Sequence, residues 1–337
     1  MKFALSAEQD EFAAVLHKLL DTADVPAAAD AWANGDPAAG RRLWRRLAEV
    51  GVTALAVPAT WGGLGAEPAD LVVACEELGH HGVPGPLAES LAAVPALLAT
   101  LSETGKAGDI LAGLAGGHLV ATLAAPPWLP YAVDADGADV VLLAEPDAVR
   151  FATTVAVSRS VDPTRRLFRV RAGAVLAAGP PVAAAVAGAL DLGALACAAQ
   201  LLGAGRAMLE LAAGYARQRT QFGRPIGQNQ AVAHQLADVA VAVEFARPLL
   251  LAAAVALATG SPTAARDVSA AKVACGQAAH RSARAALQVH GAIGYTEEYG
   301  LARWLTKVRA MTLAWGTPSA HRARVMATLR ADRDGAP

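Results

Sequence analysis

A single interruption of otherwise helical sequence most constrains the fold of this chain. Residues 118–180 carry short β-branched or alternating runs, separated by turn-forming pairs such as Asp136-Gly137 and Asp162-Pro163. The sequence on both sides repeats apolar residues at spacings of three and four, which is typical of packed helices. At about 60 residues the interruption is too short for a full barrel but long enough for a small sheet. The chain order is therefore helices, a small sheet, and helices again.

The composition favours packing of helix against helix. Hydrophobic residues make up 54% of the 337 residues, but aromatic residues only 5%, so the core must use many small side chains. The 29 Lys and Arg nearly balance the 30 Asp and Glu, which argues against a nucleic-acid-binding protein. We predict three domains: an N-terminal helical domain at 1–117, a reduced β domain at 118–180, and a C-terminal helical bundle at 181–337.

Local patterns place the helix boundaries. Ser6 and Gln9 form a capping box that opens the first helix. Gly51 to Pro58 is predicted as an extended connection, and 86–115 as one or two helices interrupted near Pro95. The remaining helices are predicted over 39–50, from Pro68 to Gly79 or Gly82, from 181 to Arg217, over 228–258, from Pro262 to Gly291, and over 318–330.

Glycines, cysteines and histidines give no separate site. Gly203-Ala204-Gly205 lacks the third glycine of a dinucleotide-binding loop and follows helical sequence, which predicts close helix packing. The three cysteines are far apart and form no CxxC pair, so we expect buried reduced thiols. The histidines show no ligand spacing, and adjacent His80-His81 cannot readily chelate one ion, so no metal is expected.

We also expect a cytoplasmic chain without a membrane span. Acidic residues follow Met1 too closely for a signal peptide. The most apolar stretches, 174–190 and 248–260, are interrupted by Pro180-Pro181 or fall short of the roughly 20 residues that a span needs.

Two segments carry candidate chemistry. Arg219, Gln221 and Phe222 follow a helix and place a planar cation, an amide and an apolar ring on one loop, which suits a diphosphate joined to a ring system. The alternative is a solvated surface loop. Further on, Gln288 precedes Gly291 and Gly294, and such glycines let a backbone approach a ligand closely or simply end a helix.

Together these segments resemble the acyl-CoA dehydrogenase family of flavoproteins. The resemblance covers 185–325 almost entirely and includes the N-terminal stretches 43–65 and Glu76-Glu77-Leu78-Gly79. It implies a mainly α, acyl-CoA dehydrogenase-like fold with an N-terminal helical domain, a reduced central β domain and a C-terminal four-helix bundle. It also implies FAD near a subunit interface, and α,β-desaturation of an acyl-CoA thioester.

The resemblance assigns cofactor contacts residue by residue. An FAD held chiefly by a neighbouring subunit would contact Arg219, Gln221, Phe222, Gln288, Gly291 and Gly294. Thr317, in Trp315-Gly316-Thr317, matches a family threonine that reaches the chain's own flavin.

The departures concern the catalytic base. The family's usual glutamate precedes a Gly-Thr pair, and Trp315 stands there. The alternative base of some members falls on Ala194, with Asp191 as a weak substitute one helical turn away. General-base catalysis therefore has no evident agent. Residues 121–127 also lack the family's flavin-facing motif, as if the flavin-facing half of the β domain were deleted.

Three interpretations follow. The favoured one is a companion subunit that completes the FAD site of a full-length partner in an α2β2 acyl-CoA dehydrogenase, with electron-transfer flavoprotein as a further partner and the electron acceptor left open. The second is a self-sufficient homodimer with an atypical base, Asp191 or Glu298. The third is a structural helical protein without FAD. The acyl substrate stays open among sterol side-chain, branched, straight-chain and carrier-bound groups.

Overall fold

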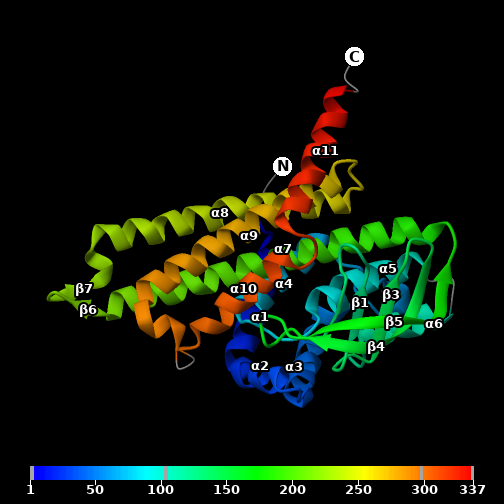
Figure 1. Cartoon of the computed structure of the whole chain (residues 1–337), viewed down its shortest axis with the longest axis horizontal. Coiled ribbons are helices and arrows are strands. Elements are labelled where there is room, and N and C mark those ends of the chain that lie inside the picture. The colour runs from blue at the N-terminus through cyan, green and yellow to red at the C-terminus, as the bar shows by residue number, and fades with distance from the viewer. Residues whose placement is uncertain (1–3, 102–104, 297–298, 335–337) are drawn as a thin grey trace.

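The computed structural model describes residues 4–101, 105–296 and 299–334. A long helical bundle forms the body of the molecule, with the main sheet at one end and a two-stranded hairpin at the other (Figure 1). The last helix, α11, projects away from this body (Figure 1).

The helices have the following bounds: α1 (Ala7–Thr22), α2 (Val25–Ala33), α3 (Ala38–Glu49), α4 (Pro68–His80), α5 (Val94–Thr100), α6 (Gly105–Ala115), α7 (Pro181–Gln218), α8 (Gln230–Ala258), α9 (Ala264–His290), α10 (Leu301–Leu313) and α11 (Pro318–Asp334). Single turns lie at η1 (Val52–Ala54), η2 (Ala59–Trp61), η3 (Glu89–Ala93), η4 (Ile226–Gln228) and η5 (Gly291–Tyr295). The strands are β1 (Ala121–Ala124), β2 (Ala132–Val133), β3 (Val140–Ala144), β4 (Ala148–Ser158), β5 (Leu167–Ala178), β6 (Thr220–Gln221) and β7 (Arg224–Pro225).

The N-terminal helices follow their capping chemistry. The backbone N–H of Gln9 donates to Ser6 Oγ at 3.2 Å, and the N–H of Ser6 donates to Gln9 Oε1 at 3.1 Å, so the predicted capping box is present. The predicted interruption near Pro95 is present as a change of helix type, because α5 begins at Val94 and Pro95 lies in its first turn, where proline is tolerated. The turn before it, η3, is a π-helix.

One other local prediction needs correction, and some elements were missed. The segment from Gly51 to Pro58 is not extended, because Gly51 has a φ of +81° and leads into the 3₁₀ turn η1. Helices α2 and α10 and strand β2 were not predicted. These elements are short and are stabilised by packing on neighbours distant in sequence, so the local residue pattern does not indicate them.

The main sheet has five strands in the order β1-β3-β4-β5-β2. β1 pairs with β3 in parallel, and the other pairs are antiparallel. Every residue of β1 is buried, whereas β4 and β5 form a long, largely exposed ribbon with register shifts. The predicted mainly α fold with a small central sheet is confirmed.

The bundle is built around α7, which packs on α4, α8 and α9. A Cβ at Gly203 would lie 1.9 Å from the carbonyl oxygen of Glu76, and one at Gly79 would lie 2.2 Å from that of Gln200. Two glycines therefore let the backbones of α4 and α7 touch, which confirms the close packing predicted for Gly203. All three cysteines are buried free thiols.

The prediction that the most apolar stretches are too short or too interrupted to span a membrane is wrong in its lengths. By length and composition, α7 and α8 are each long and apolar enough to cross a membrane. Of the most apolar 18-residue segment, 61% is buried within the molecule in α7 and 44% in α8. The core helix of a bundle meets the same criterion, and α7 occupies such a core.

Candidate functional site

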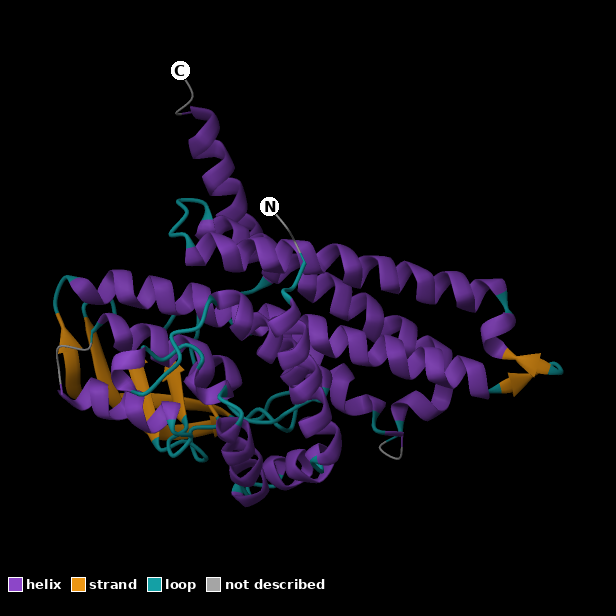
Figure 2. Cartoon of the chain, turned by 180° about the vertical axis from the view of Figure 1, so that it is seen from behind, coloured by secondary structure: helices purple, strands orange, loops and turns teal. Residues whose placement is uncertain are grey.

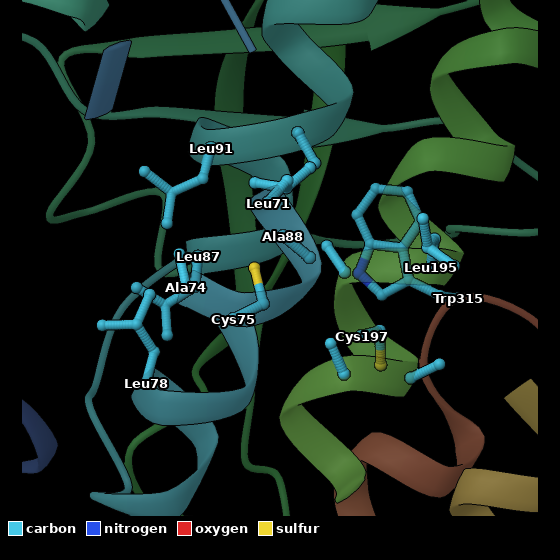
Figure 3. Packing of buried hydrophobic residues seen from close by; sticks show 14 of the residues in the cluster. Leu71, Ala74, Cys75, Leu78, Leu87, Ala88, Leu91, Leu195, Cys197 and Trp315 are labelled. Carbon is cyan, nitrogen blue, oxygen red and sulfur yellow. The ribbon is translucent and has the colours of Figure 1, made fainter. Parts of the chain in front are cut away.

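The inner part of the site lies where the bundle meets the sheet, at Trp315. This residue follows α10 with a φ of +57° and is 2% exposed. Its indole packs directly on the backbone of Gly193 in α7, because a Cβ there would lie 2.2 Å from Trp315 Cζ3. Figure 3 shows the ring inside the buried cluster next to Leu195. The predicted base position is thus occupied by core packing.

A second indole fills the space beside the first. A Cβ at Gly316 would lie 2.4 Å from Trp128 Cζ3, so Trp128 packs against the chain immediately after Trp315. A cavity of about 150 Å³ remains, lined by Trp128, Ala187, Leu190, Ala194, Trp315, His321 and Arg324. Cofactor pockets commonly have about 300–1,000 Å³. The lining contains no carboxylate among the described residues.

The carboxylate of Asp191 is held in an ion pair. Its two oxygens accept from the two terminal nitrogens of Arg324, one of these bonds measuring 3.0 Å from Nη2 to Oδ2. The guanidinium carbon of Arg324 lies 5.8 Å from the centroid of the Trp128 ring. Asp191 therefore stabilises the junction between α7 and α11, while Ala194 offers no proton acceptor. Glu298, the other predicted substitute base, lies outside the described residues.

His321 fixes the turn that carries Trp315. A carbonyl oxygen only accepts, so the Nε2–H of His321 donates to the Trp315 carbonyl at 2.8 Å. In the neutral ring Nδ1 is then the acceptor, and it accepts from Ser269 Oγ–H at 3.1 Å. Burial lowers the pKa of His321 to about 4, so the ring is neutral near pH 7. The imidazole is a structural partner of Trp315.

A buried glutamate that was not predicted from the sequence adjoins the tryptophan. Glu89 is fully buried, and burial raises the pKa of its carboxyl group, an effect partly offset by the Arg165 charge. The one sequence clue was a lone charge inside the apolar run 87–94. Glu89 does not line the cavity beside Trp315, so it is enclosed rather than presented to a substrate.

The outer part of the site lies at the far end of the bundle, on the hairpin of β6 and β7 (Figure 2). Gln221 pairs with Arg224 across the hairpin, and Phe222 at the turn has a φ of +52° and is 98% exposed. Arg219 caps α7 and is exposed. The guanidinium of Arg224 donates to Asn229 Oδ1 at 2.7 Å.

The second predicted segment reaches the same end. The ring of Tyr215, near the end of α7, stacks on His290, near the end of α9, with centroids 4.5 Å apart. Gln288 is exposed, and Gly291 ends α9 with a φ of +64° and open space where a Cβ would be. Gly294 is buried in η5.

Thr317 lies elsewhere, at the start of α11. Its hydroxyl accepts from the N–H of Ala320 at 3.2 Å and pairs with Ser319 Oγ at 3.0 Å, so it caps the helix. The structure thus separates Thr317 from the other predicted cofactor contacts.

Comparison with known proteins identifies the chain. The family models described as acyl-CoA dehydrogenase, N-terminal domain, and acyl-CoA dehydrogenase, C-terminal domain, match residues 6–117 and 183–329. The chain belongs to the acyl-CoA dehydrogenase family. Acyl-CoA dehydrogenase IpdE2 of Mycobacterium tuberculosis is 36% identical over 281 residues, which cover 82% of this chain and 83% of that protein. The IpdE2 of Mycolicibacterium smegmatis is 33% identical over 92% of this chain and 94% of that protein.

Solved acyl-CoA dehydrogenases share the fold. Butyryl-CoA dehydrogenase from Megasphaera elsdenii superposes with a TM-score of 0.83 at 21% identity, covering 98% of this chain and 100% of that one. A structure described as the Tcur3481-Tcur3483 steroid ACAD G363A variant gives a TM-score of 0.83 at 24% identity, covering 97% and 99%.

Acyl-CoA dehydrogenases use FAD, and the residues of this family member fit that cofactor in part. The exposed guanidinium, amide and ring of Arg219, Gln221 and Phe222 suit a diphosphate and its attached groups. The junction at Trp128 and Trp315 does not suit an isoalloxazine, because the two indoles fill it and leave only about 150 Å³. The exposed residues at the hairpin end therefore fit part of an FAD, whereas the described residues at Trp128 and Trp315 are closely packed.

Proposed function

We propose that this chain is a companion subunit of an FAD-dependent acyl-CoA dehydrogenase. It lacks a catalytic base of its own and completes the FAD site of a full-length partner. The observation that carries this proposal is the contact of Trp315 with Gly193, because a buried indole packed on the helix backbone stands at the position that the resemblance assigns to the family's glutamate.

The chemistry requires two agents that the junction does not offer. Desaturation of an acyl thioester needs a base for the α-proton and a flavin that accepts hydride from the β-carbon. In this chain Ala194 is apolar and Asp191 is engaged by Arg324. The acyl group and the flavin ring are therefore assigned to the partner, whose base performs the proton abstraction.

The chain's own contribution lies on its hairpin end. Arg219 would neutralise the diphosphate of the partner's FAD, Gln221 would hydrogen-bond to it, and Phe222 would cover its apolar parts. Gln288 and the backbone at Gly291 would extend the same contact from α9. These residues bind and orient the cofactor without moving a proton.

Exposed apolar side chains provide a surface for the partner. Phe245 is 75% exposed on α8, and Met326 and Leu329 are about half exposed on the projecting α11. An open groove of about 920 Å³ lies between α8, α9 and the start of α11 and contains Arg281 and Arg322. Apolar side chains flanking a groove are typical of a subunit interface.

Relatives and structural neighbours support this assignment. The Tcur3481-Tcur3483 steroid dehydrogenase is named for two components, which makes a sterol-type acyl-CoA one candidate substrate. The caffeyl-CoA reductase subunit CarC of Acetobacterium woodii belongs to an Etf complex, which supports electron-transfer flavoprotein as the electron acceptor.

Co-expression with a full-length homologue that retains the glutamate tests the proposal. We expect a yellow complex with one FAD per heterodimer, and we expect this chain purified alone to lack stoichiometric flavin. One FAD per chain in the protein purified alone would overturn the proposal. A complex without flavin absorbance would favour a purely structural protein instead.

A further inference from the structure

Two pairs of metal-binding residue types face each other where α1 packs on α4. His17 and Asp21 are four residues apart on α1, and Glu77 and His81 are four residues apart at the end of α4. Residues at this spacing lie on the same side of a helix. The packing of the two helices therefore brings two imidazoles and two carboxylates together, far from the hairpin and from Trp315.

The donor atoms are already close. His17 Nδ1 lies 2.8 Å from Glu77 Oε2, and His81 Nε2 lies 3.1 Å from Asp21 Oδ1. His17, Glu77 and His81 each offer a ligand atom within 4.8 Å of the other two. Ligand atoms around a tetrahedral Zn²⁺, with bonds of about 2.0–2.2 Å, are roughly 3.4 Å apart. Small side-chain rotations would bring the donors to that spacing.

Second contacts orient these donors. The carbonyl oxygen of Glu77 accepts from His81 Nδ1–H at 3.0 Å, which leaves the lone pair of Nε2 facing Asp21. The other carboxylate oxygen of Glu77, Oε1, accepts from Arg206 at 2.5 Å. Metal-binding imidazoles in proteins usually donate their other ring N–H in this way.

The charges of the cluster favour a dication. The ion-paired network around Glu77 contains four carboxylates and two guanidiniums: Asp21, Glu76, Glu77 and Glu210, with Arg206 and Arg247. Its carboxylates therefore exceed its guanidiniums by two. The exposed ammonium of Lys18 lies on the rim of the same hollow.

A third imidazole stands against the other two. The ring of His80 lies 5.1 Å from that of His17 and 4.9 Å from that of His81, measured between centroids. His80 is 9% exposed, and its Nδ1 has no hydrogen-bond partner among the described residues. The hollow over His17, Asp21 and Glu77 is open to solvent, so an ion has a path of entry.

We propose that His17, Glu77 and His81, with Asp21, form a binding site for one divalent transition-metal ion, and that Zn²⁺ fits this ligand set best. Imidazole and carboxylate donors in a four-ligand site are typical of zinc. The ion would clamp α1 to α4 and so stabilise the N-terminal domain. This site is independent of FAD and of the partner subunit.

Zinc titration of the full-length chain after EDTA treatment, with a competing chromophoric chelator, tests the proposal. We expect one Zn²⁺ per chain, and at least tenfold weaker binding in both His17→Gln and His81→Gln. The exposed His118→Gln is the matched control and should bind as the wild type does. Unchanged affinity in either cluster variant, or Mg²⁺ binding as tight as Zn²⁺ binding, would overturn the proposal.

A surface variant and a spectroscopic measurement separate loss of zinc binding from loss of folding. Asp21 is largely exposed, so Asp21→Asn should fold normally and still weaken zinc binding. Co²⁺ should give the visible bands of a tetrahedral site in the wild type and lose them in His81→Gln. Zinc should also raise the melting temperature of the wild type but not that of His81→Gln, and equal shifts in both proteins would contradict the assignment.

Discussion

Trp315 and Gly193 form a contact in which the indole rests directly on a helix backbone, with room for a hydrogen atom but not for a methyl group. The contact joins the turn before α11 to the central helix α7, and it involves the position to which the family resemblance assigns the catalytic glutamate. The contact therefore predicts that adding one methyl group, by Gly193→Ala, lowers the free energy of unfolding.

Gly193→Ala should destabilise the fold by about 1–3 kcal/mol, because the new Cβ displaces the Trp315 ring from a close-packed core. Gly188→Ala, in the same helix with open space at its Cβ, should instead stabilise by about 0.5–1 kcal/mol through helix propensity. Urea denaturation measures both changes in unfolding free energy. Equal effects of the two substitutions would show that the indole does not rest on Gly193 in solution.

Asp191→Asn should lower stability without changing the chemistry of the complex. Removing the charge leaves Arg324 partly buried without its partner, at a cost of about 1–3 kcal/mol. A general base contributes about 10²–10⁴-fold to the reaction rate. A loss of that size in the turnover number of the co-expressed complex would identify Asp191 as the base. We expect an unchanged turnover number, measured by dye-linked desaturation.

Acid should weaken the fold through His321. The pKa of this residue is depressed to about 4 in the folded state, so its neutral form stabilises the fold fully above pH 6.5, and that stability is lost as the pH falls through 4. The expected loss is on the order of 1–2 kcal/mol after allowance for solvent screening. Unfolding free energies measured from pH 7.5 to 4 should fall less steeply in His321→Gln than in the wild type. His118→Gln, with an exposed ring, should follow the wild-type slope.

Arg219→Ala and Phe222→Ala should reduce the flavin content of the co-expressed complex while leaving the melting temperature of the chain alone unchanged. Both side chains are exposed, so their truncation removes few internal contacts. Arg217→Ala, also exposed at the end of α7, is the matched control and should retain flavin. Full flavin occupancy in both Arg219→Ala and Phe222→Ala would show that these two side chains do not bind the FAD diphosphate.

Periodicity and capping predicted the long elements correctly because those patterns are local. The apolar spacing from 181 onward gave the bundle, and the capping box at Ser6 gave the first helix. The interruption near Pro95 was predicted because proline favours the first turn of a new helix, but nothing in the sequence pattern indicated that the turn before it is a π-helix.

By itself, the sequence determined the helix, sheet and helix order, the close approach at Gly203, and the absence of a carboxylate at Trp315 and Ala194. Only the tertiary structure decided that Asp191 pairs with Arg324, that the Trp315 indole packs on Gly193, and that His17 meets His81 across two helices. The physical reason is range. A spacing rule describes only residues within a few turns of each other. Ion pairs, packing and metal ligands depend instead on side chains that the fold brings together from 60 or more positions apart.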